Sequence, residues 1–251
     1  MSGDPISGPP QGMPNLLRRS AQGLIVTAKP WIYGRYPSAL NGQRFRQRLF
    51  RSLIRAFDPE AIFESGTYGG ASTHFLWTLS GRPIWTVEKN RGWAYCAKRR
   101  FRTIPEIRVL SGDSRAALRS LRDSNDFPAS RALFYLDAHW EADLPLREEV
   151  DMITSRWADS IIVIDDFKVP DDSGYGFDAY GDDELSMDYL GSKAIGRYEA
   201  FWPNCPSGKE SGARRGCVIL VAPSVRSEVQ GLPELRRIEG SRVNTSRPLP
   251  V

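Results

Sequence analysis

Short apolar runs rich in β-branched residues alternate with helical stretches through the middle of the chain, and this pattern limits the fold more than any other feature. The runs typical of strands are AIFESG, PIWTVEKN, IRVLSGD, RALFYLD and SIIVID, with segments such as STHFLWTLS and SRAALRSLR between them. Continuous apolar strands separated by helices indicate a parallel sheet with both faces covered. We therefore expect a doubly wound, mostly parallel α/β fold.

The length of 251 residues suits one such domain with an extension. Apolar residues at 41% and charged residues at 25% are ordinary globular values, which argues against disordered, fibrous and membrane-embedded classes. We predict a disordered tail over 1–14, an N-terminal helical or lid extension over 15–58, the main domain over 59–230 and a C-terminal tail over 231–251.

An amphipathic helix is expected from Gln43 to Phe57. Its apolar residues recur every four positions, and its arginines form another face with Arg44, Arg48, Arg51 and Arg55. The helix should end at Asp58, because the residue before a proline disfavours the helical conformation. An arginine face of this kind is more often solvated than bound to nucleic acid, so we do not expect a nucleic-acid partner. A non-catalytic protein that binds RNA or a membrane through this helix stays an alternative.

The cysteines and the start of the chain favour a reducing compartment. Cys96, Cys205 and Cys217 are an odd number without CxxC spacing, so neither a disulfide framework nor a zinc site is suggested. No basic-then-apolar leader and no apolar stretch long enough for a membrane span are present. We expect a soluble cytoplasmic protein; a homo-oligomer is compatible with the sequence.

The segment FESGTYGGAST places Glu64 at a strand end, before a glycine-rich turn into a helix. Glycines allow positive φ and close approach of a ligand, and the helix start, with Ser72 as its cap, offers free N–H groups. A dinucleotide fingerprint would have GxGxxG spacing and would bind a pyrophosphate, which Glu64 would repel. A carboxylate here suits the cationic amino group of S-adenosylmethionine, so a nicotinamide oxidoreductase is disfavoured.

Two further acids end the next two strands, Glu88 in WTVEKN and Asp113 in LSGDS. An acid after the second strand is placed to accept both ribose hydroxyls, and one after the third to accept the adenine amino group. The ordered set of three strand-end acids predicts a nucleoside cleft.

In these motifs, ESGTYGGAS, TVEKN, SGDS and YLDAHW, the chain resembles the class I S-adenosylmethionine-dependent methyltransferases. The resemblance covers about residues 60–170. It implies a seven-stranded sheet with a reversed hairpin at one edge, which the run GCVILVAP would help to complete. The implied cofactor-binding residues are Glu64, Gly66, Thr67, Gly70, Ser72, Glu88, Asp113 and Ser114.

A second constellation consists of Asp137 in FYLDAHW with Asp165 and Asp166 in VIDDF, at the ends of two consecutive strands. Three oxygen ligands on adjacent strand ends suit Mg²⁺, which prefers octahedral oxygen coordination. The ion would lower the pKa of a bound hydroxyl and orient it toward the methyl donor.

These acids resemble those of the metal-dependent O-methyltransferases of the catechol and macrocin type. The resemblance implies methyl transfer to a small hydroxylated acceptor, a sugar or a natural product. The pair after the fifth strand is Asp-Asp rather than Asp-Asn, which argues against catechol itself. His139, two residues after Asp137, is a candidate general base, with a structural or metal-ligand role as the other option. A metal-independent methyltransferase in which the aspartates bind the acceptor is the alternative.

Overall fold

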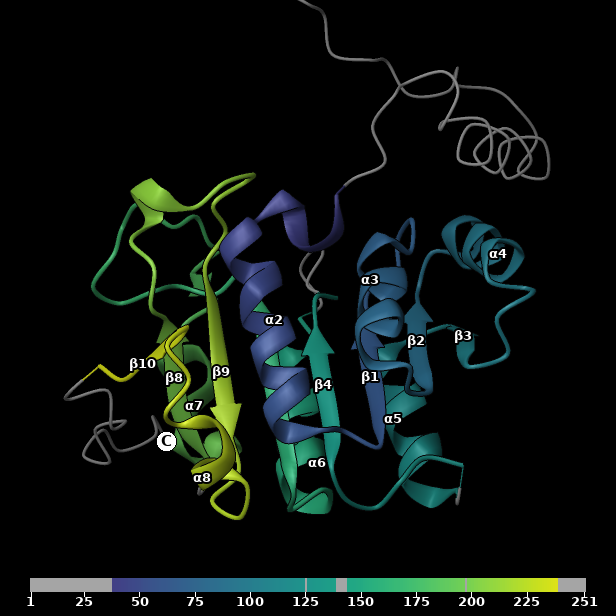
Figure 1. Cartoon of the computed structure of the whole chain (residues 1–251). Coiled ribbons are helices and arrows are strands. Elements are labelled where there is room, and N and C mark those ends of the chain that lie inside the picture. Colours follow the sequence, from purple (N-terminus) through teal and green to yellow (C-terminus); the bar gives the residue numbers. More distant parts are fainter. Residues whose placement is uncertain (1–37, 125, 139–143, 197, 239–251) are drawn as a thin grey trace, which may run out of the picture.

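The computed structural model describes residues 38–238 apart from 125, 139–143 and 197. Figure 1 shows this part of the chain as a sheet flanked by helices. The predicted tail over 1–14, most of the extension over 15–58 and His139 lie outside the described residues.

The central sheet has eight strands in the order β10-β8-β9-β5-β4-β1-β2-β3. The parallel strands are β1 (Ala61–Ser65), β2 (Ile84–Glu88), β3 (Ile107–Ser111), β4 (Ala132–Leu136) and β5 (Ser160–Asp165). The antiparallel strands are β8 (Glu199–Pro203), β9 (Cys217–Val221) and β10 (Leu235–Arg236). The mostly parallel fold is thus confirmed. The eighth strand is a difference: β10 pairs with the edge of the reversed hairpin, within the segment predicted as a tail.

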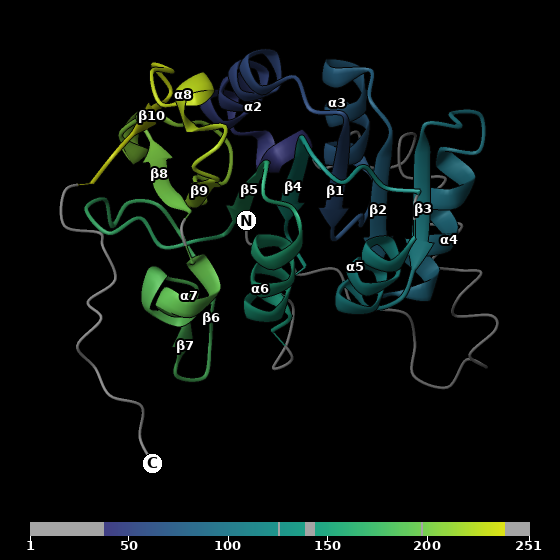
Figure 2. The same ribbon diagram turned by 90° about the horizontal axis from the view of Figure 1, so that it is seen from below.

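Helices cover both faces of the sheet (Figure 2). One face carries α2 (Arg44–Phe57), α3 (Ala71–Ser80) and α8 (Arg226–Val229), and the other carries α5 (Ser114–Asp123), α6 (Leu146–Arg156) and α7 (Met187–Ile195). Helix α4 (Arg91–Arg100) packs against β2 and β3 at one edge. Short elements complete the described chain: η1 (Ala39–Gly42), η2 (Ser207–Lys209), β6 (Ala179–Tyr180) and β7 (Asp183–Glu184).

Two apolar cores lie between the sheet and these layers, because alternate strand residues point to opposite faces. Ile62 belongs to the core under α2, whereas its neighbour Phe63 belongs to the core under α5 and α6. Burial of one such large apolar side chain stabilises the fold by about 1.5–3 kcal/mol. Since each strand contributes to both cores, the strand ends, and the turns that follow them, are held in fixed positions.

Helix α2 confirms the predicted amphipathic segment, with one correction at its start. Gln43 is the N-cap residue but its side chain makes no capping bond. Glu210 takes this role from a distant part of the chain, since its carboxylate accepts hydrogen bonds from the N–H groups of Phe45 (3.0 Å) and Arg46 (3.1 Å). The helix ends at Phe57, before Asp58 in the left-handed conformation. No helix among the described residues has the length and apolar content that a bilayer crossing requires.

Candidate functional site

The chain reverses its direction of strand addition at β1, which lies between β4 and β2. In open α/β sheets, ligands bind at the carboxyl edge beside such a switch point. Here the turn after β1 meets the turn after β4: the Asp137 N–H donates to the Ser65 carbonyl at 3.0 Å. A Cβ on Gly66 would lie 2.3 Å from the Asp137 carbonyl oxygen. The two predicted sites are therefore adjacent, and Gly66 is required for their close approach.

The glycine turn leads into α3, as predicted, but its capping differs. Gly66 and Gly70 have positive φ, and a Cβ on Gly70 would lie 2.6 Å from the ring of Phe101. Gly70 is the N-cap residue of α3 and no side chain caps the helix. The prediction of Ser72 as the cap is wrong, because the helix begins one residue earlier, at Ala71. The Ser72 hydroxyl accepts the N–H of Leu40 at 3.0 Å instead.

Glu64 is fully buried beneath this turn. Its Oε2 accepts hydrogen bonds from the hydroxyls of Thr73 and Thr86 (2.6 Å for Thr86), and Thr67 in turn bonds to Thr86 at 2.6 Å. Its Oε1 has no hydrogen-bond partner. Burial raises the pKa of Glu64 to about 7, although the two threonine hydroxyls oppose this rise. An acceptor atom is thus left available beside the turn.

Glu88 lies at the end of β2 and organises the same turn. Its Oε2 accepts the N–H of Tyr68 at 2.7 Å, and its Oε1 accepts the N–H of Asn90 at 2.8 Å. Burial raises its pKa above the ordinary value. Each carboxylate oxygen has two lone pairs, so one on each remains for further donors such as ribose hydroxyls.

Asp113 follows β3 and is the N-cap residue of α5, where its Oδ1 accepts the N–H of Arg115 at 2.9 Å. The Arg115 guanidinium also binds both carboxylate oxygens, at 3.0 and 2.8 Å. This hydrogen bonding lowers the pKa of Asp113 to about 2. The neighbouring Ser114 is buried. Contacts of Asp113 and Ser114 with adenine stay predictions, and Asp113 already has these other partners.

Asp165, at the end of β5, forms an ion pair with Arg46 of α2 in which both side chains are buried. Its Oδ2 also accepts hydrogen bonds from the Tyr135 hydroxyl (2.7 Å) and the Asn41 amide (3.4 Å). Burial favours the neutral acid, but the charge and hydrogen bond of Arg46 outweigh it and hold the pKa of Asp165 below its ordinary value. Both carboxylate oxygens of Asp165 therefore have donors.

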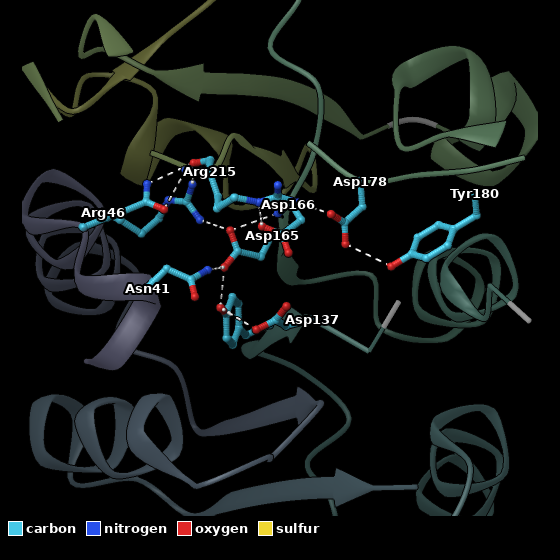
Figure 3. A network of polar contacts seen from close by, with 10 residues as sticks. Asn41, Arg46, Asp137, Asp165, Asp166, Asp178, Tyr180 and Arg215 are labelled. Atoms are coloured by element: carbon cyan, nitrogen blue, oxygen red, sulfur yellow. Dashed lines mark hydrogen bonds and ion pairs between the residues drawn. The ribbon is translucent and has the colours of Figure 1, made fainter. Parts of the chain in front are cut away.

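Asp166 has the left-handed φ of 52° and pairs with Arg215 in the network of Figure 3. Arg215 Nε lies 2.5 Å from Asp166 Oδ1, and the same guanidinium forms an ion pair with Asp178. Tyr180 donates to Asp178 at 3.0 Å, which extends the network into the loop after β5. Burial and the charge of Asp165 raise the pKa of Asp166 to about 6, although Arg215 opposes this.

Asp137 directly follows β4 and lies below Asp165 in the view of Figure 3. The Tyr135 hydroxyl, whose shorter bond is to Asp165, lies 3.2 Å from Asp137 Oδ2. Burial, followed by the charges of Asp165 and Asp166, raises the pKa of Asp137 well above its ordinary value. Tyr135 thus connects the two strand-end acids. The predicted base role of His139 falls outside the described residues.

The structure brings Asp137, Asp165 and Asp166 to one edge, as predicted, but their side chains do not fit Mg²⁺ as they lie. Arginines already bind two of them, since Arg46 pairs with Asp165 and Arg215 pairs with Asp166. Among the described residues, no group of three or more His, Cys, Asp or Glu side chains is arranged to hold a metal ion. We therefore derive no chemical step through a metal.

Sequence reasoning missed the two arginines. Arg46 lies four residues before Phe50 and eight before Ile54, and all three are on the buried face of α2. This helical spacing from apolar residues was the sequence signal that could have predicted burial of Arg46. Arg215 lies just before β9, and its position gave no comparable signal. Glu149 in the first turn of α6 was also missed, and its side chain is fully buried.

No protein-family model matches the chain, and no curated protein matches its sequence. Solved structures match its fold. An O-methyltransferase from Bacillus cereus in complex with SAH is 14% identical with a TM-score of 0.50, over 84% of this chain and 93% of that one. The O-methyltransferase TomG from Streptomyces achromogenes, involved in tomaymycin synthesis and solved with SAM, is 16% identical with a TM-score of 0.52, over 84% and 90%. The chain thus has the Rossmann-like fold of these enzymes.

Proposed function

We propose that this protein is an S-adenosylmethionine-dependent methyltransferase that methylates a hydroxyl oxygen of a small acceptor, such as a sugar or a natural product. The observation that carries the proposal is the contact between the glycine turn after β1 and Asp137 after β4, with Glu64 and Glu88 beside the same turn. Two enzymes with this fold hold SAH or SAM in their solved structures, which supports the choice of cofactor.

The cofactor's expected contacts fit the chemistry of the described residues. Gly66 and Gly70 leave no room for a Cβ, Glu64 Oε1 is a buried acceptor without a partner, and Glu88 keeps lone pairs for hydroxyl donors. We assign Glu64 to the amino group of the methionine part and Glu88 to the ribose. Asp113 and Ser114 are assigned to the adenine, with Thr67 and Ser72 lining the turn. When bound, the cofactor supplies an electrophilic methyl group on a sulfonium.

Asp137 is proposed to orient the acceptor and to accept its proton. The bound cofactor would supply the methyl group and leave as the thioether, and the Asp137 carboxylate would take the proton of the attacking acceptor hydroxyl. Tyr135 holds Asp137 from one side through its hydroxyl. His139 remains a second candidate for the proton. The Mg²⁺ contribution predicted from sequence receives no support from the side-chain geometry, so the proposal takes the metal-independent form.

A ligand panel tests the cofactor before any acceptor is known. Thermal unfolding would be measured with S-adenosylmethionine, S-adenosylhomocysteine, NAD and ATP, since a ligand that binds only the folded state raises its stability. We expect the first two to raise the unfolding temperature and NAD to have no effect. A rise with NAD alone would favour an oxidoreductase and overturn the proposal.

Acceptor screening then tests the reaction. Release of S-adenosylhomocysteine would be followed with pools of hydroxylated sugars and natural products, and with a matched pool of amines. Turnover on hydroxylated compounds that is lost in Asp137→Ala, while S-adenosylhomocysteine still binds, is the expected result. Binding of RNA with steep salt dependence and no turnover would favour the alternative of a non-catalytic protein.

A further inference from the structure

Two guanidinium groups stand as counterions to the acids that predicted a magnesium site. Arg46 pairs with Asp165, and Arg215 pairs with Asp166. We propose that these arginines supply the positive charge at this sheet edge that a divalent ion would otherwise supply, and that Arg215 is the residue that keeps such an ion from binding. The proposal concerns charge at the strand ends, so it is testable without cofactor or acceptor and independently of methyl transfer.

Arg46 is fixed in its place by burial and by a second bond. Its side chain and that of Asp165 are 2% and 0% exposed, and its Nη2 donates to the Arg215 carbonyl at 2.6 Å. Removal of one partner from such a buried pair leaves an uncompensated charge, which is strongly unfavourable. The guanidinium therefore cannot swing into solvent to make room for an ion. Asp165 is committed to Arg46.

Arg215 is held from its backbone. The Gln43 amide donates to the Arg215 carbonyl at 2.9 Å and accepts the Arg215 N–H at 2.9 Å. With its main chain clamped, the guanidinium bridges Asp166 and Asp178 and is itself 24% exposed. Arg215, just before β9, therefore connects that strand to the turn and loop that follow β5. Its partial exposure makes it the easier arginine to replace without unfolding the protein.

An entering ion would have to displace these contacts. Carboxylates that lie close together repel one another unless a cation compensates them, and the two guanidinium groups already do so. Charge-assisted hydrogen bonds from arginine to carboxylate are about twice as strong as neutral ones. Mg²⁺ also gives up its bound water reluctantly. We therefore expect the native protein to take up no divalent ion at this edge, and the loss of Arg215 to leave the carboxylates of Asp166 and Asp178 without their shared counterion.

The experiment measures binding of Mn²⁺ by electron paramagnetic resonance and thermal unfolding in EDTA, Mg²⁺ or Mn²⁺. Arg215→Met is compared with the native protein and with Arg236→Met, a matched control whose arginine is 26% exposed and pairs with Asp171, which is not one of the three clustered acids. We expect tight Mn²⁺ binding and a rise in unfolding temperature only for Arg215→Met. An ion at a hundredfold excess over its dissociation constant shifts the unfolding equilibrium about 100-fold.

The native protein gives an answer even if Arg215→Met fails to fold. Stoichiometric Mn²⁺ binding by the native chain that disappears in Asp166→Asn would overturn the proposal. So would a well-folded Arg215→Met that binds no more Mn²⁺ than Arg236→Met does. The proposal is supported when the gain seen in Arg215→Met is lost again in the double variant Arg215→Met/Asp166→Asn, because the ion then depends on that carboxylate.

Discussion

Arg46 of α2 and Asp165 of β5 form an ion pair that is buried between the helix and the sheet, although 119 residues separate them in the chain. The pair ties helix α2 to the strand end that carries two of the three predicted acids, Asp165 and Asp166. The pair also favours the ionised form of Asp165, since Arg46 keeps the pKa of Asp165 below its ordinary value. A residue of the extension is therefore part of the site.

Replacement of Asp165 by Asn should cost about 3–5 kcal/mol in the free energy of unfolding, because the buried Arg46 charge then lacks its counterion. Denaturant unfolding measures the loss. The control is Asp171→Asn, whose partner Arg236 is partly exposed, and it should cost less than about 1 kcal/mol. Equal losses in the two variants would show that burial of the first pair has no special effect.

Replacement of Glu88 by Ala should weaken binding of S-adenosylhomocysteine by roughly tenfold or more, because two hydroxyl acceptors are lost and Tyr68 loses its anchor. Isothermal titration calorimetry is the measurement. Asp113→Ala should have a smaller effect, since a single hydrogen bond contributes about 0.5–1.5 kcal/mol. The reverse order of the two effects would contradict the assignment of ribose to Glu88.

Replacement of Gly66 by Ala should destabilise the protein far more than replacement of Gly81 by Ala. Both glycines have positive φ, but a Cβ at Gly66 meets the Asp137 carbonyl, whereas at Gly81 nothing lies within 4 Å. Gly81→Ala therefore reports the backbone strain alone, about 1 kcal/mol. The further loss of stability in Gly66→Ala measures the contact between the two turns. Thermal unfolding of both variants gives this difference. Similar unfolding temperatures would mean that the turns separate readily.

Replacement of Glu149 by Gln should change how stability depends on pH. Burial raises the pKa of Glu149 from 4.5 to about 7, although the hydroxyls of Ser114 and Ser65 oppose this. The folded state thus binds the proton more tightly than the unfolded state. The resulting stabilisation is fully present below pH 4.5 and is lost as the pH rises to about 7.

The stability of Glu149→Gln relative to the native protein should therefore increase by about 3 kcal/mol between these two pH values and stay constant above them. Urea unfolding at a series of pH values provides the comparison. Parallel curves for the two proteins would contradict the raised pKa. Because Ser65 and Ser114 flank Glu149, binding of S-adenosylhomocysteine to the same variant would also show whether this carboxyl positions the cofactor turns.

The sequence by itself determined the α/β fold and the strand-end positions of Glu64, Glu88 and Asp137. These follow from local pattern: apolar runs define strands, the residue after each run lies at a strand end, and parallel strands end at one edge. The glycine turn was likewise predictable, because positive φ and close backbone approach require glycine. The helix from Arg44 to Phe57 followed from its four-residue apolar spacing.

The tertiary structure alone decided how the acids are compensated. A sequence shows that Arg46 and Asp165 exist, but ion pairing depends on which side chains meet after α2 packs on the sheet, and that contact spans most of the chain. The same holds for Arg215, whose approach to Asp166 requires the reversed strand β9 to lie beside β5. Three aspartates at neighbouring strand ends predicted a metal site, whereas in the structure two of them form ion pairs with arginines. Charge compensation is a property of packed neighbours, and local pattern does not carry that information.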